Sequence, residues 1–193
     1  MIEKLVLAMS SNNLIEDSES EYMMYAMSLL FEKIVSIISI LLIGICMNSF
    51  VEIILFLIFF SSLRKYTGGY HLNSFLKCYI CSMIITIGII LFADYIVMKD
   101  AVMLSVVFVS EVVILMIGAV NHPNMQWDRN EEQQSRNRAR FVEITEGMVI
   151  FFCILLGTSR KCVTYMIMGI LLCSLLLLLA KIIGQEVRGN EKG

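Results

Sequence analysis

Charged residues are scarce in this sequence. Only 17% of its 193 residues are Asp, Glu, Lys or Arg, whereas 58% are hydrophobic, and the mean hydropathy is +0.80. Soluble domains carry about 25% charged residues, so this composition argues against a soluble fold. The apolar residues form long runs separated by short polar connectors, as membrane spans require. We therefore expect an all-α, polytopic membrane protein with a single domain.

Basic residues are not in excess, and proline is nearly absent. The formal net charge is -2, which leaves no surplus of Lys and Arg to neutralise phosphates, so we expect no nucleic-acid partner.

The first residues lack a basic segment followed by a compact apolar core and a small-residue cleavage site, so we expect no removable signal peptide. The single proline, Pro123, falls at the end of an apolar run, the usual place for a helix breaker.

The six cysteines do not form the dense framework of a small secreted protein. Five of them lie in apolar runs or at their ends, where a free cysteine behaves as a small hydrophobic residue. Cys78 and Cys81 make one Cys-x-x-Cys pair, but no second pair completes a tetrahedral zinc site. We expect no structural disulfide, no metal and no cofactor.

Six apolar runs follow a mixed amino-terminal region. They cover residues 34–47, 50–63, 78–97, 102–120, 141–157 and 162–183. The first two have only 14 residues each, against the roughly 20 that a helix needs to cross about 30 Å of hydrocarbon. They could form a re-entrant hairpin, or cross the membrane twice with help from their flanks. Ser18 and Glu21 fit a capping box at a helix start.

The predicted organisation follows from these runs. It comprises an amphipathic interfacial region 1–33, a hydrophobic hairpin 34–63, a polar segment 64–77, two spans in 78–120, a charged loop 121–140, two spans in 141–183 and a tail 184–193. With a cytoplasmic amino terminus, only three of the 15 Lys and Arg residues fall outside, namely Lys99, Arg160 and Lys161. By the positive-inside rule, both termini, the polar segment and the charged loop are predicted to be cytoplasmic.

The polar segment combines a flexible turn with two reactive residue types. Gly68 and Gly69 allow a sharp change of chain direction just before His71. Cys78 follows seven residues later, and a base must come within about 3 Å of the atom that it deprotonates. On one continuous helix the two residues would stand about 10.5 Å apart along the axis. His71 can therefore serve Cys78 as a base only if the intervening chain bends.

Local charge favours a reactive form of Cys78. The residue opens an apolar run, close to a helix amino terminus, where the macrodipole favours a thiolate. Arg64 and Lys77 add positive charge nearby, so a nucleophilic cysteine with His71 as base is one interpretation. A solvated histidine, a packing cysteine or a dithiol redox pair of Cys78 and Cys81 remain alternatives.

The stretch 64–78 resembles the accessory gene regulator protein B family, membrane cysteine endopeptidases that mature peptide pheromones in Gram-positive bacteria. The shared elements are the basic entry at Arg64, Gly69 shortly before the histidine, and the spacing of seven from His71 to Cys78. The layout of a polar start, a hydrophobic hairpin, the His/Cys segment and further spans around one charged loop is also similar.

This resemblance implies a function and roles for the site. Cys78 would be the nucleophile and His71 the general base. The residues themselves, apart from the resemblance, suggest Arg64, Gly68, Gly69 and Lys77 as supporting residues. The substrate would be a small ribosomal, AgrD-like propeptide, cleaved through an acyl-enzyme thioester and cyclised to a thiolactone or lactone quorum-sensing signal. Two other functions stay open: a peptide transporter or export partner, and a membrane thiol oxidoreductase that uses Cys78 and Cys81.

Other polar residues lie within the apolar runs. Glu143 and Glu146 begin the fifth run, where Glu146 could orient His71 or pair with a nearby cation; the simpler interpretation is a pair of acids at a helix amino terminus. Glu111 lies in mid-span, where a carboxylate is costly and often functional. A cluster of three basic residues could contact anionic lipids or an acidic peptide, or act only as a positive-inside anchor. It comprises Arg136, Arg138 and Arg140. Membrane lipids are expected neighbours, and a homodimer stays open.

Overall fold

The computed structural model describes residues 20–68, 75–93, 99–121 and 128–184, and within them it is all-helical. Its helices are α2 (Ser20–Cys46), α3 (Phe50–Thr67), α4 (Phe75–Ala93), α5 (Asp100–Ile117), α6 (Arg129–Leu155) and α7 (Arg160–Ile183). The predicted all-α class is confirmed. In the described part, α4, α5 and α7 are long and apolar enough to cross a membrane. Ser18, Pro123 and residues 1–19 of the predicted interfacial region 1–33 lie outside the described residues, and residues 20–33 belong to α2.

The first two helices are longer than their apolar runs. α2 has 27 residues and α3 has 18, which is about 40 Å and 27 Å at 1.5 Å per residue. Both extend through charged flanks, Glu32 and Lys33 in α2 and Arg64 and Lys65 in α3. A three-residue turn joins them, with Asn48 in a left-handed conformation at φ 53°. α3 is therefore as long as α5, which the run lengths alone did not indicate.

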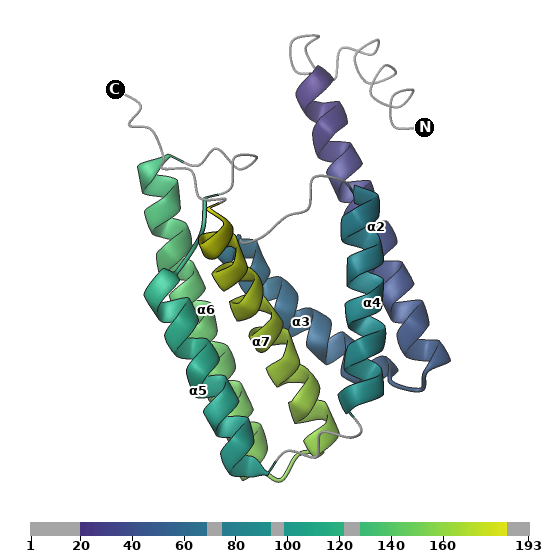
Figure 1. Ribbon diagram of the computed structural model, residues 1–193, viewed down its shortest axis with the longest axis vertical. Helices are drawn as coiled ribbons and strands as arrows, with labels where there is room; N and C mark the ends of the chain where they lie inside the picture. The colour runs from purple at the N-terminus through teal and green to yellow at the C-terminus, as the bar shows by residue number, and fades with distance from the viewer. Residues whose placement is uncertain (1–19, 69–74, 94–98, 122–127, 185–193) are drawn as a thin grey trace.

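α7 lies at the centre of the bundle and packs against α3, α4, α5 and α6 (Figure 1). Its closest approach is to α3. A Cβ atom added to Gly169 would lie 2.9 Å from the carbonyl oxygen of Phe56 and 3.0 Å from the amide nitrogen of Phe60. Small residues allow helix backbones to approach in this way inside membranes. Two apolar clusters flank this contact, one towards α5 and α6 and the other towards α2 and α4.

Successive helices alternate in direction, so α3, α5 and α7 finish at the end of the bundle where α4 and α6 begin (Figure 1). At this end the amide of Val120 donates a 2.9 Å hydrogen bond to the carbonyl oxygen of Thr67. At the opposite end, Arg160 lies 3.3 Å from Asp100 and Lys161 lies 3.8 Å from Glu52.

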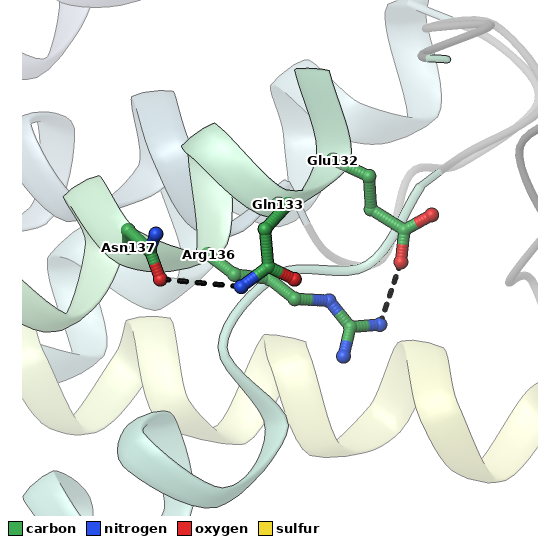
Figure 2. A network of polar contacts seen from close by, with 4 residues as sticks. All are labelled: Glu132, Gln133, Arg136 and Asn137. Atoms are coloured by element: carbon green, nitrogen blue, oxygen red, sulfur yellow. Dashed lines mark hydrogen bonds and ion pairs between the residues drawn. The ribbon is translucent and has the colours of Figure 1, made fainter. Parts of the chain in front are cut away.

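The predicted loop 121–140 is wrong from Arg129 onwards, because α6 begins there. Asp128 Oδ1 accepts from the Glu131 amide at 2.8 Å, and Glu131 Oε2 accepts from the Asp128 amide at 3.0 Å, which completes a capping box. The next turns carry side-chain pairs four residues apart, shown in Figure 2. They are Glu132 with Arg136 at 2.7 Å and Gln133 with Asn137 at 3.4 Å. These polar contacts extend the helix well beyond its apolar run.

Candidate functional site

The end of α3 is held by contacts from its own side chains and from a neighbouring segment. Gly68 caps the helix at φ 64°, a conformation that favours glycine. The guanidinium of Arg64 donates a hydrogen bond to the Gly68 carbonyl oxygen, and Val120 pairs with Gly68 in an isolated bridge. The chain is thus directed out of α3 at a defined point. Gly69 and His71 lie outside the described residues.

Cys78 lies in the first turn of α4 and is partly buried. The Arg64 guanidinium is close enough to interact electrostatically with both Cys78 and Cys173. Arg64 at the end of α3 is therefore within electrostatic range of the Cys78 thiol at the start of α4. Lys77, the other predicted supporting cation, is exposed. The bend that would bring His71 to Cys78 stays a prediction.

Tyr79 fastens the start of α4 to α2, a contact that sequence reasoning missed. Its hydroxyl donates a 2.9 Å hydrogen bond to Ser39 Oγ. Because Tyr79 directly follows Cys78, this bond fixes the rotation of α4 beside the thiol. The only signal in the sequence was a tyrosine within an apolar run, where its hydroxyl needs a partner when buried.

Cys173 on α7 is a second thiol near Arg64, and it is fully buried. Thr67 Oγ1 lies 3.3 Å from its Sγ, and Arg64, Glu143 and Glu146 all interact with it electrostatically. These residues come from three helices, so their proximity could not be read from spacing along the chain. Cys173 is therefore close both to polar residues at the end of α3 and to the carboxyl groups of α6.

Glu143 and Glu146 are buried in the middle of α6, 14 and 17 residues after Arg129. The interpretation of helix amino-terminal acids is therefore wrong, because the dipole effect fades within the first turn. The Ser62 hydroxyl of α3 donates a hydrogen bond to Glu146 Oε1. Glu146 thus contacts α3 two residues before the predicted catalytic segment.

Glu111 of α5 faces α6 and joins this group of carboxyls. Its carboxylate rests on Gly147, where any Cβ atom would collide with Oε1. Glu111 and Glu146 each interact electrostatically with Glu143. Glu111, the carboxylate that the sequence places in mid-span, therefore packs against α6, which carries Glu143 and Glu146.

Two of the three clustered arginines have structural contacts. Arg140 Nε donates a 3.2 Å hydrogen bond to the Leu115 carbonyl oxygen in the last turn of α5. The aliphatic part of Arg136 packs on Gly118, which caps α5 at φ 74°. Both residues fasten α6 to the end of α5, and Arg138 is exposed. A lipid or peptide contact by all three together is therefore not favoured.

The helical bundle and its apolar spans define a polytopic membrane protein with a thiol and a cation at one end. The family model described as Accessory gene regulator B matches residues 2–178. The chain belongs to this family.

Two relatives support this assignment over part of the chain. "Putative AgrB-like protein 2" of Clostridium perfringens (strain 13 / Type A) is 38% identical over 89 residues, which is 46% of this chain and 42% of the relative. "Putative AgrB-like protein" of Clostridium perfringens (strain SM101 / Type A) is 37% identical over 89 residues, with the same shares. The chain thus spans less than half the length of the curated relatives that it matches. No solved structure matches significantly.

Proposed function

We propose that this protein is a membrane-embedded cysteine endopeptidase that cleaves the carboxy-terminal part from a small propeptide and promotes cyclisation of the remaining, enzyme-bound part. The observation that carries the proposal is the placement of Cys78 in the first turn of α4, with the Arg64 guanidinium brought near it from α3. Membership of the accessory gene regulator B family supports the substrate class.

The proposed reaction has two acyl transfers. The Cys78 thiolate attacks a backbone carbonyl of the propeptide, and His71 first takes the thiol proton and then returns it to the departing amine. The products are an acyl-enzyme thioester and a free carboxy-terminal tail. An internal Cys or Ser of the bound part then attacks the thioester, which closes the ring and restores the Cys78 thiol. Thioester exchange retains the acyl activation, so the ring closure needs no nucleotide.

Arg64 would act as a positioning residue with an electrostatic role. Its hydrogen bond to Gly68 holds the start of the connection between α3 and α4, and its charge lies near Cys78. A fixed cation at this position stabilises negative charge that develops during attack. A site at the membrane boundary also limits the water that would hydrolyse the thioester.

We also propose that this end of the bundle faces the cytoplasm. It carries most of the basic residues of the described part, including Arg64, Lys65 and Arg138. At the opposite end Arg160 and Lys161 have acidic partners, so their charge is locally offset. The excess of basic residues at the end that carries Arg64 and Cys78 favours a cytoplasmic site.

The direct test is processing of the propeptide encoded next to this gene, expected to hold an amphipathic segment, a Cys or Ser and an acidic tail. Co-expression with Cys78→Ala should leave the propeptide uncleaved at a normal level of inserted protein. Cys46→Ala is the matched control, since Cys46 is exposed at the end of α2 away from the site, and it should process normally. Normal cleavage by Cys78→Ala would overturn the proposal.

A further inference from the structure

Two glutamates of α6 are buried without the partners that a carboxylate requires. Glu143 is 0% exposed and Glu146 is 8% exposed. In the part of the chain that the structure describes, neither oxygen of Glu143 has a hydrogen-bond partner, and Oε2 of Glu146 has none either. The hydrogen bond from Ser62 reaches only Glu146 Oε1. Buried polar groups are normally satisfied, so these atoms need an explanation.

The charged and titratable groups around Glu143 come from every helix packed against α6. α5 contributes Glu111, and α6 itself contributes Glu146, so both charged groups that act on Glu143 are acidic. α7 contributes the Cys173 thiol, which interacts electrostatically with both α6 carboxyls and with Arg64. α3 contributes the Ser62 hydroxyl. The surroundings thus add negative charge to a site already closed to solvent.

Ionised carboxylates in such a place are strongly disfavoured, because desolvation and mutual repulsion act together. A bound cation would remove this cost. The described residues contain no group of three or more side chains suited to a metal ion, and Glu143 is fully enclosed. A proton is the cation that fits an enclosed site, because it needs no additional volume.

We propose that Glu143 and Glu146, with Ser62 as the hydrogen-bonding partner of Glu146, form a proton-binding site in the interior of the bundle. The site holds at least one proton while α6 is packed against α3 and α5. Loss of that proton places repelling charges among Glu111, Glu143 and Glu146 and loosens α6 from α3. Ser62 precedes Arg64 by two residues, so protonation of the site adjusts the end of α3. This inference does not depend on the peptidase function, and its tests do not use cleavage.

The first test is infrared spectroscopy of the full-length protein in lipid bilayers at neutral pH. A protonated carboxyl group absorbs at a higher frequency than a carboxylate. The wild type should show a protonated carboxyl band, and Glu143→Gln or Glu146→Gln should reduce it. Glu52→Gln is the matched control, because Glu52 is paired with Lys161, and it should leave the band unchanged. A wild type without the band, or a band that neither α6 variant changes, would overturn the proposal.

The second test is thermal stability as a function of pH. A folded state that holds a proton more tightly than the unfolded state loses stability as the pH rises. The unfolding temperature of the wild type should therefore fall from mildly acidic to mildly alkaline pH, and the fall should be smaller in the Glu143→Gln, Glu146→Gln double variant. Identical pH profiles for the double variant, wild type and Glu52→Gln would contradict a proton site, as would stabilisation of the wild type by sodium but not by protons.

Discussion

The guanidinium of Arg64 donates a hydrogen bond to the carbonyl oxygen of Gly68, four residues further along the chain. This bond joins the last turn of α3 to its glycine cap, and the same guanidinium lies near Cys78 at the start of α4. One side chain therefore supports the exit from one helix and supplies charge at the entrance of the next. Both effects act between these two helix ends, where the reaction is proposed to take place.

Two substitutions of Arg64 can distinguish the contribution of its charge from the contribution of its hydrogen-bonding geometry. Arg64→Gln should lower the rate of propeptide cleavage on the order of 100-fold, the usual effect of losing a group that stabilises the transition state. Arg64→Lys should lose less, because it keeps the charge but not the planar donor geometry. The measurement is single-turnover cleavage by purified protein in bilayers. Equal rates for wild type and Arg64→Gln would argue against the assigned role.

The close contact between α3 and α7 gives a stability prediction. Gly169→Ala would place a Cβ atom 2.9 Å from the Phe56 carbonyl oxygen, so the helices must separate, at a cost of about 1–3 kcal/mol. Gly88→Ala in α4 is the matched control, since nothing lies within 4 Å of its added Cβ atom. Thermal unfolding in detergent should show a lower midpoint for Gly169→Ala only. Equal midpoints for the wild type and Gly169→Ala would contradict the close contact between α3 and α7.

A good part of this architecture was predictable from the sequence, for a physical reason. Residues that must face lipid form uninterrupted apolar runs, so α4, α5 and α7 were located within a few residues. The start of α6 was missed because its first turns are polar and depend on capping and side-chain pairs, not on an apolar face. The capping residues Asp128 and Glu131 were a usable signal.

The residues of the candidate site were likewise predictable from the sequence only in part. Cys78 and Arg64 could be selected because they interrupt an apolar sequence within one short segment. Contacts between distant segments could not, since the bond between Thr67 and Cys173 spans 106 residues. The burial of Glu143 was missed because the helix start had been placed too late, which gave the residue a dipole role that it does not have.

The dithiol alternative makes a different prediction for Cys81. Cys81 is exposed on α4, one turn after Cys78. A thiol oxidoreductase needs both sulfurs, so Cys81→Ser would be as damaging as Cys78→Ser. The peptidase needs only Cys78, so Cys81→Ser should retain nearly full cleavage. Cleavage assays of the two single variants decide between these functions, and equal loss in both would favour the redox function.

The orientation in the membrane can be tested with fusions placed by the structure. Alkaline phosphatase is active only outside the cytoplasm. Fused after Lys99, before α5, it should be active, and fused after Gly184, beyond the end of α7, it should be inactive. A fusion within 129–155 would truncate α6 and is avoided. Similar activity at the two positions would contradict the proposed sidedness.

The most direct measurement of the central claim is the site of the acyl-enzyme. A propeptide whose ring-closing Cys or Ser is replaced by Ala cannot cyclise, so its amino-terminal part should remain on the enzyme. Mass spectrometry of the digested protein should find this part attached to the peptide containing Cys78, and hydroxylamine should release it as expected for a thioester. Attachment to another cysteine, or cleavage that continues in Cys78→Ala, would contradict the account.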